Sequence, residues 1–515
     1  MRSRYSLINI TAGLTNQLII TMLSFLSRTI FIQTLGVEYL GINGLFTNLL
    51  AMLTLAEAGL GASIMYSLYK PVADNDYMKI RILMKFYRQA YMVIAAIVFV
   101  LGLLLFPFLD FFVKGANIED VELIYFIFLL NTVAPYFYIH KNSFLNVAQR
   151  GYIVTAVYTV SSIVTAVMKI AILSYTHNYL LYLIIDSVIT IANSIILAVM
   201  VNRMYPYLRE KVAGKLDEIT KGQITTNVKA IVIQNIGNYL LFGTEHLLIA
   251  SFVSLVAVGI YSNYKMVIDI ARTFINQVFS NVYHSVGNLV ANESMVKIIA
   301  IYKCYRLVNF WLYSSLTIVL AFTLEPFIRI WLGSDFLFSQ EALLVILLLT
   351  FYERGMRNSI SAIKTTAGLF REDQYAPLLQ AGISLIFALV LVQFLGITGI
   401  FLGHFLSALF VPFWFTPYVV YKKLFKLPVR QYFTSYLSLM FIGLVAYLLT
   451  KVILMPFSPV SFSTFLIYLF VSLVLPNLLY IIVFYRTDEF QYILKMVLTI
   501  LRRLQAKRRD RMISS

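Results

Sequence analysis

Long runs of apolar residues, separated by short polar segments, make up most of the chain. These runs exceed the ~18 residues that a helix needs to cross a bilayer. They lack the strict alternation of apolar and polar residues that is typical of membrane barrel strands. The pattern therefore predicts fourteen transmembrane helices, at about 8–35, 40–66, 88–113, 121–147, 151–174, 178–202, 226–253, 256–286, 305–332, 340–364, 375–395, 397–421, 431–455 and 461–485.

The composition supports an all-α polytopic membrane protein. Of the 515 residues, 60% are hydrophobic and 13% are charged, whereas soluble domains are about 45–50% apolar. The single cysteine, Cys304, excludes disulfide scaffolds and multi-cysteine metal sites. The polar segments are too short for a soluble catalytic domain, and the motif GxxxxGK[ST] is absent. We therefore expect a protein that is not an enzyme, with no cofactor and no metal site.

The basic residues give the predicted helices an orientation. If the N-terminus is cytoplasmic, the segments 67–87, 203–225, 287–304 and 422–430 lie inside, together with the tail from Arg486. With seven of the 41 Lys and Arg residues inside spans and three in outer loops, 31 remain on the cytoplasmic side, as the positive-inside rule requires. The net charge of +17 thus reflects membrane orientation. We expect the basic tail to contact anionic lipid and not nucleic acid.

The second half of the chain repeats the first weakly. An offset of 218 aligns Asn9 with Asn227, Asn16-Gln17 with Gln234-Asn235, Arg28 with His246, Gly41-Ile42 with Gly259-Ile260, and Asp186 with His404. Both copies begin in the cytoplasm and hold six helices, so they are parallel repeats, an arrangement typical of alternating-access transporters. The predicted domains are an N-terminal lobe 1–202, a basic linker 203–225, a C-terminal lobe 226–421, a helix pair 431–485 and a basic tail 486–515.

The first two helices of each copy carry polar residues three or four positions apart, which is the spacing of one helix face. A charged group at bilayer depth costs about 2.5–3.5 kcal/mol, so it needs a partner, a cavity or a function. We therefore predict a water-accessible cavity between the lobes. Its expected polar lining includes Asn16, Gln17, Gln234, Asn238 and Asn276.

Three basic residues in these helices are candidates for an anionic substrate group: Arg28, Lys265 and Arg272. Arginine suits bidentate phosphate contacts, and lysine supplies a point charge. Two alternatives remain open. Lys265, Asp269 and Arg272 have the spacing of an intrahelical ion-pair ladder, and Arg28 lies near enough to its helix end to reach the outer interface.

Five further ionisable residues within the spans are candidates for coupling transport to an ion. They are Glu57, Asp186, Glu245, His246 and Asp269. The alternative is that they are structural polar partners. The 35 Tyr and 40 Phe residues offer surfaces for sugar rings, although interface belts and lipid-facing surface explain most aromatic residues in such proteins.

The segment LGVEYLGINGLFTNLLAMLTLAEAGLGASIMYSLYKPVADND, Leu35 to Asp76, resembles the helix 1–2 signature of bacterial polysaccharide repeat-unit flippases. These are the O-antigen and capsule transporters of the multidrug/oligosaccharidyl-lipid/polysaccharide (MOP) exporter superfamily. The resemblance extends to the two six-helix lobes, the basic linker, GITGIFLGHFLS at Gly396 to Ser407, and the final helix pair.

The resemblance implies a flippase of the bacterial cytoplasmic (inner) membrane with both termini cytoplasmic. It would move undecaprenyl-pyrophosphate-linked oligosaccharide to the outer leaflet, with H⁺ or Na⁺ as a coupling ion. Polysaccharide polymerase and glycosyltransferases of the same pathway are the implied partners. Lipid II flippases are similar in having helix 1 and helix 8 arginines, which correspond here to Arg28 and Arg272. Their helix 2 arginine has no counterpart, because this helix carries Glu57.

The same sequence features leave three alternative functions open: a lipid II flippase, a drug/cation antiporter and a membrane-embedded polysaccharide polymerase. The polymerase would need a substantial outer loop with basic and catalytic residues, whereas the outer loops here are short and mildly acidic. An antiporter would need a net acidic cavity, which the basic residues in the spans disfavour.

Overall fold

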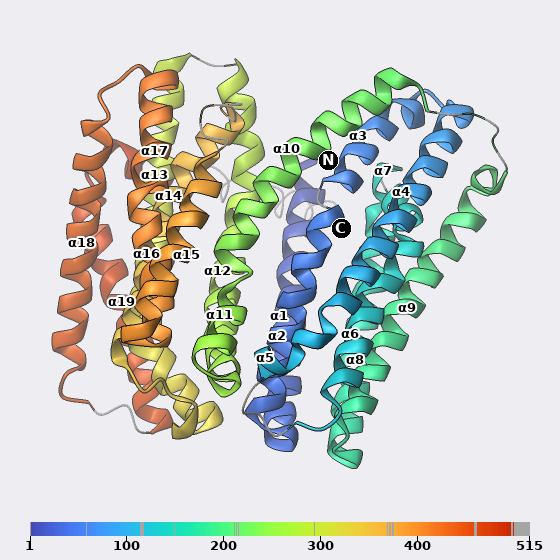
Figure 1. Cartoon of the computed structure of the whole chain (residues 1–515). Coiled ribbons are helices and arrows are strands. Elements are labelled where there is room, and N and C mark those ends of the chain that lie inside the picture. The colour runs from blue at the N-terminus through green and yellow to red at the C-terminus, as the bar shows by residue number, and fades with distance from the viewer. Residues whose placement is uncertain are drawn as a thin grey trace, which may run out of the picture. The chain divides into compact units, whose positions relative to one another are not determined.

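The computed structural model describes residues 2–495 and 498, except for 58, 114–117, 149, 211, 213, 215, 293, 368, 370–371, 373–374 and 458–460. It describes the backbone but not the side chains at 2–18, 56, 62, 219, 223, 227, 229–231, 233–234, 238, 242, 277–278, 280 and 281–292. Throughout these described residues the regular structure is helical and contains no strand (Figure 1). The predicted all-α fold is therefore confirmed.

The helices of the first half follow the predicted spans closely. They are α1 (Arg2–Leu35), α2 (Val37–Leu53), η1 (Thr54–Glu57), α3 (Leu60–Ala73), α4 (Tyr77–Leu104), η2 (Phe106–Phe108), α5 (Leu109–Val113), α6 (Val121–Val133), η3 (Ala134–Phe137), α7 (Ile139–Val147), α8 (Gly151–Thr176), α9 (Tyr179–Met204), η4 (Pro206–Arg209) and α10 (Glu218–Phe242).

The second half continues in the same way. Its helices are α11 (Glu245–Phe252), α12 (Leu255–Asn292), α13 (Met295–Leu332), η5 (Ser334–Phe336), α14 (Glu341–Thr366), α15 (Ala376–Leu395), α16 (Ile397–Phe410), α17 (Pro412–Val419), η6 (Val420–Phe425), α18 (Arg430–Leu454) and α19 (Phe462–Phe484). Each of the fourteen predicted spans thus coincides with one helix or with a chain of shorter helices.

Eight of these helical segments are long and apolar enough to cross a membrane by themselves within the described part of the chain, and the bent pair Val121–Phe137 and Ile139–Val147 makes up to nine. The helix α14 is long enough but does not pass the same test. Its centre carries Glu353, Arg354 and Arg357, so its charges lower its hydropathy. The charged residues therefore mark a span whose polar groups need partners inside the protein.

Several predicted spans consist of more than one helix, and three of them show where the helices end. In the second, α2 passes into the 3-10 helix η1, and α3 begins after Gly59, whose φ of 82° suits glycine. In the seventh, α10 ends at Phe242 and α11 begins at Glu245. In the twelfth, Pro412 begins α17, and its missing N–H removes a helical hydrogen bond. Breaks of this kind inside a membrane occur where side chains or water satisfy the freed backbone groups.

The chain divides into two compact units, a first unit of Met1–Ser262 and a second unit of Asn263–Ser515. The division falls inside α12, so α10, α11 and the start of α12 belong to the first unit. The sequence repeat assigns these helices to the second copy. The lobe boundaries at the 203–225 linker therefore stay a prediction.

The predicted C-terminal helix pair packs against α13 within the second unit. The Trp311 indole of α13 donates a 2.5 Å hydrogen bond to Asn477 of α19, and Ser314 and Tyr480 share a 2.6 Å hydrogen bond. Aromatic rings surround these bonds, with Phe310 5.1 Å from Tyr480. A buried polar pair inside apolar packing favours one register over others, so α19 is held at a defined position on α13.

Candidate functional site

The predicted substrate residue Arg28 lies on α1, half-buried within the first unit. Its guanidinium donates a hydrogen bond to the hydroxyl of Ser262 on α12. The side chain therefore turns toward protein within the described part of α1. The alternative in which Arg28 extends along α1 to the outer interface does not fit this contact.

A second cation lies near Arg28, although the sequence spacing does not indicate it. The ammonium of Lys169 on α8 lies 2.7 Å from a carboxylate oxygen of Asp186 on α9 and 4.4 Å from the ring centroid of Tyr182. Arg28 also interacts electrostatically with Tyr182. The first unit therefore gathers Arg28, Lys169 and Asp186 around one aromatic ring.

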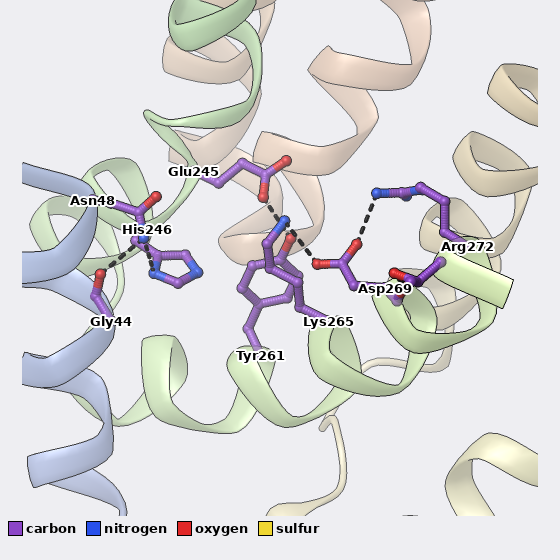
Figure 2. A network of polar contacts seen from close by, with 9 residues as sticks. Gly44, Asn48, Glu245, His246, Tyr261, Lys265, Asp269 and Arg272 are labelled. Atoms are coloured by element: carbon purple, nitrogen blue, oxygen red, sulfur yellow. Dashed lines mark hydrogen bonds and ion pairs between the residues drawn. The ribbon is translucent and has the colours of Figure 1, made fainter. Parts of the chain in front are cut away.

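The predicted coupling residues Glu245 and His246 are both buried on α11. The Tyr261 hydroxyl donates a 2.6 Å hydrogen bond to Glu245, and the amide nitrogen of Asn48 lies 2.9 Å from Nδ1 of His246. Figure 2 shows these two groups, with Asn48 reaching His246 from α2 and Tyr261 reaching Glu245 from α12. The Tyr239 hydroxyl donates to the backbone carbonyl of Asn48 at 2.6 Å, which fixes the position of that asparagine.

In the second unit, α12 carries the predicted charged residues along one face. Asp269 lies 3.9 Å from Lys265 and 2.7 Å from Arg272 (Figure 2), so the intrahelical ladder is present. The side chains remain accessible, with 32% of Lys265, 42% of Asp269 and 29% of Arg272 exposed. The Arg272 guanidinium also lies 6.0 Å from the ring centroid of Phe351. Charges this exposed on a predicted span need water or a polar ligand beside them.

Glu57 occupies the break between α2 and α3, in η1. Its Oε2 atom is buried and has no hydrogen-bond partner among the described residues. The hydroxyls of Tyr91 and Tyr136 lie near the carboxylate, and their rings are 5.8 Å apart. Among the described residues, hydroxyl groups and no basic side chain are recorded beside this carboxylate, and a buried carboxylate in such surroundings is suited to hold a proton or a cation.

Of the five residues predicted to line the cavity, the structure describes the side chain of one. Asn16, Gln17, Gln234 and Asn238 belong to helices α1 and α10, but their side chains lie outside the described residues. Asn276 is described and is exposed on α12. The predicted polar lining of the cavity therefore stays a prediction.

Family models and curated proteins give no match to this chain. Solved structures do. The lipid II flippase MurJ in an inward closed conformation is similar over 93% of this chain and 99% of its own, with a TM-score of 0.63 at 15% sequence identity.

Multidrug transporters are also similar. The MATE transporter VcmN of Vibrio cholerae matches 83% of this chain and 98% of its own, with a TM-score of 0.55 at 16% identity. An inward-facing MATE family transporter of the MOP superfamily matches 77% and 96%, with a TM-score of 0.53 at 16% identity. Identities this low support the fold alone. The chain therefore has the membrane-transporter fold that MurJ shares with MATE transporters of the MOP superfamily.

Proposed function

We propose that this protein is a flippase that moves undecaprenyl-pyrophosphate-linked oligosaccharide from the cytoplasmic to the outer leaflet of the bacterial inner membrane. The observation that carries the proposal is the half-exposed charged face of α12, with Lys265, Asp269 and Arg272 inside a predicted span. Facing lipid, these charges would cost several kcal/mol. They are better explained by an aqueous path for a polar, charged substrate.

The two arginines suit a pyrophosphate. Each guanidinium presents a fork of N–H donors that matches two phosphate oxygens. Arg28 lies on the first helix of the first repeat and Arg272 on the second helix of the second repeat, so each repeat would contribute one arginine to the headgroup. The prenyl tail would stay in lipid while the charged headgroup and sugars cross.

Transport in one direction requires a bound ion or substrate that favours one conformation over the other, because equal binding to both conformations shifts no equilibrium. Glu57 is the first candidate for H⁺ or Na⁺, since its Oε2 is buried with no hydrogen-bond partner in the described part of the chain. Glu245, His246, Asp186 and Asp269 all have neighbouring polar groups, which supports a structural role for them as well.

Two related functions compete with this one. The likeness to MurJ keeps lipid II as an alternative cargo, and the likeness to MATE transporters keeps a drug or cation antiporter. The basic side chains Arg28 and Arg272 favour an anionic cargo over a cationic drug. The Leu35–Asp76 signature favours a repeat-unit oligosaccharide over lipid II, and it also suggests a polysaccharide polymerase and glycosyltransferases as partners.

The test is a flipping assay in proteoliposomes that measures how fast a defined lipid-linked oligosaccharide becomes accessible on the opposite leaflet. We expect the wild-type protein to accelerate flipping of the pyrophosphate-linked lipid and not of an uncharged analogue. Arg28→Ala and Arg272→Ala should each abolish the acceleration. Arg329→Ala is the matched control, because Arg329 is an exposed arginine at the end of α13.

The outcomes separate the three functions. Accelerated flipping of lipid II, and of no other lipid-linked glycan, would show that lipid II is the cargo. Exchange of a cationic drug for an ion, with no flipping of either lipid, would assign the antiporter. Full activity in both arginine variants would exclude the cationic mechanism, whichever lipid is carried.

A further inference from the structure

The segment after α9 folds back along the cytoplasmic ends of α4 and α7 within the first unit. Arg81 of α4 forms an ion pair with Glu210, and Lys85 donates a 3.1 Å hydrogen bond to the carbonyl of Val212. The ring of Tyr205 lies 5.1 Å from that of Phe144 on α7. These contacts attach the start of the basic linker to both helices.

The same packing gathers three basic residues. The Tyr87 hydroxyl donates a 3.1 Å hydrogen bond to Ser143, which joins α4 to α7 one residue before Arg88 and two residues after Lys141. Arg88 and Arg209 are both close enough to Lys141 to repel it electrostatically. We call Arg88, Lys141 and Arg209 the cytoplasmic basic cluster.

The acidic residues of the basic linker are already engaged in ion pairs. Glu210 pairs with Arg81, Asp217 lies 4.0 Å from Lys79, and Glu218 lies 3.4 Å from Lys221. These are the acidic residues of the 203–225 linker. Within the part of the chain that the structure describes, no ion pair reaches Arg88, Lys141 or Arg209.

The linker residues outside the described part add no acid either, since positions 211, 213 and 215 are lysine, alanine and lysine. Like charges held together cost free energy unless an anion joins them.

A second observation lies directly beside the cluster. His140 is 5% exposed, and its Nδ1 has no hydrogen-bond partner among the described residues. Asn142 is 8% exposed, and its side-chain carbonyl oxygen also has no hydrogen-bond partner among them. These residues flank Lys141 on α7. Buried polar atoms are nearly always satisfied by protein, water or a ligand. The carbonyl oxygen of Asn142 is itself an acceptor and does not bind an anion, but His140 can donate from Nδ1 when that nitrogen carries the proton, and it lies close to Lys141 and Arg88. The three cations and His140 thus point to an anion with several oxygen atoms.

We propose that the cytoplasmic basic cluster is a binding site for a phosphate-bearing headgroup at the inner surface of the membrane. Two sources share this chemistry: an anionic phospholipid such as phosphatidylglycerol, and the pyrophosphate of a lipid-linked substrate. The second source rests on the proposed function, because the cluster would then receive the headgroup on the leaflet where transport begins. The first source does not depend on it.

The experiment uses the full-length protein in phosphatidylcholine nanodiscs. One arm titrates inorganic pyrophosphate and follows binding by calorimetry. The other arm adds a minor fraction of phosphatidylglycerol and counts retained lipids by native mass spectrometry. The test variant is Arg88→Gln, Lys141→Met, Arg209→Gln, and the control variant removes the same charge from the cytoplasmic end of the second unit by Lys423→Gln, Lys426→Gln, Arg430→Gln.

We expect the wild-type protein and the control variant to bind the probes, and the test variant to lose about tenfold or more in affinity. Pyrophosphate binding that depends on the cluster would identify a site able to take the substrate headgroup. Retention of phosphatidylglycerol alone, again dependent on the cluster, would identify a phospholipid site. Equal behaviour of the test and control variants in both arms would overturn the proposal.

The flipping assay separates this proposal from the proposed function. Cluster-dependent binding in a wild-type protein that flips no lipid-linked oligosaccharide would contradict the function and leave the site in place. Normal flipping with no binding that depends on the cluster would contradict the site and leave the function in place. A thermal unfolding curve for each variant checks that the protein is folded, and Arg88→Lys, Arg209→Lys should restore binding if charge is what matters.

Discussion

Gly41 of α2 lies against Leu255 of α12, and Gly259 of α12 lies against Val37 of α2, so the two close contacts are reciprocal. A Cβ atom on Gly41 would overlap the backbone carbonyl oxygen of Leu255, and a Cβ atom on Gly259 would overlap that of Val37. The sequence offset of 218 maps Gly41 onto Gly259 and Val37 onto Leu255. The two contacts are therefore related by the internal repeat, and both lie within the first unit.

The same offset relates a second pair of contacts. Arg28 donates to Ser262, while His246, its equivalent in the repeat, lies against Gly44, where a Cβ atom would be 2.9 Å from Nδ1 of the histidine. Gly44 is in turn the equivalent of Ser262 under this offset. The repeat is thus visible as a local two-fold arrangement in which equivalent residues contact equivalent positions.

This arrangement predicts that Gly41→Ala and Gly259→Ala have similar effects. Each added methyl group would force α2 and α12 apart, and overpacking of this kind costs about 1–3 kcal/mol. We expect each variant to lower the thermal unfolding temperature and to slow flipping, if flipping passes through this conformation. Gly382→Ala is the control, because a Cβ atom there meets nothing within 4 Å. A loss in one glycine variant but not in the other would show that the contacts are not energetically equivalent.

The ion pair between Lys169 and Asp186 gives a second prediction, which decides whether Asp186 is a structural partner or a coupling residue. Asp186→Asn removes the counter-charge of Lys169, so we expect a loss of about 1–3 kcal/mol in stability. Lys169→Met combined with Asp186→Asn removes both charges and should recover most of that stability.

The measurement is thermal unfolding followed by the flipping assay. Recovery of both stability and flipping in the double variant would assign Asp186 a structural role. Recovery of stability without recovery of flipping would instead indicate that Asp186 couples transport to an ion, or that Lys169 binds the substrate.

These contacts also show which features the sequence could predict. The ladder of Lys265, Asp269 and Arg272 follows from helical spacing, because residues three and four apart share a helix face. The pair of Lys169 and Asp186 joins two helices, so its spacing of seventeen residues carries no such signal. The fourteen predicted spans follow from hydropathy alone, whereas the breaks in α2–α3 and α10–α11 depend on local backbone conformations that hydropathy does not record.

The α12 ladder gives a third prediction. Asp269→Asn leaves the charges of Lys265 and Arg272 in place but removes the carboxylate that holds Arg272 at 2.7 Å. We therefore expect Asp269→Asn to reduce flipping less than Arg272→Ala does. The assay is run with and without a proton or sodium gradient. If Asp269 binds the coupling ion, the variant will instead lose its response to the gradient while it still flips lipid slowly at equilibrium.

Within α14, Arg357 donates two hydrogen bonds to the carboxylate of Glu353, with 3.0 Å between Nη2 and Oε2. Glu353 is 3% exposed, and Tyr432 and Tyr436 of α18 interact electrostatically with Arg357. The pair therefore lies where α14 meets the C-terminal helices. A buried charge left without its partner costs about 3–5 kcal/mol, because neither water nor another group solvates it.

We accordingly expect Glu353→Gln to lower the thermal unfolding temperature strongly and to loosen α18. Glu341→Gln, at the exposed first turn of the same helix, should change the unfolding temperature little. Limited proteolysis between α17 and α18 would report the loosening directly. Equal unfolding temperatures for the two variants would mean that the buried pair contributes no net stability, and that Arg357 finds another partner when Glu353 is neutral.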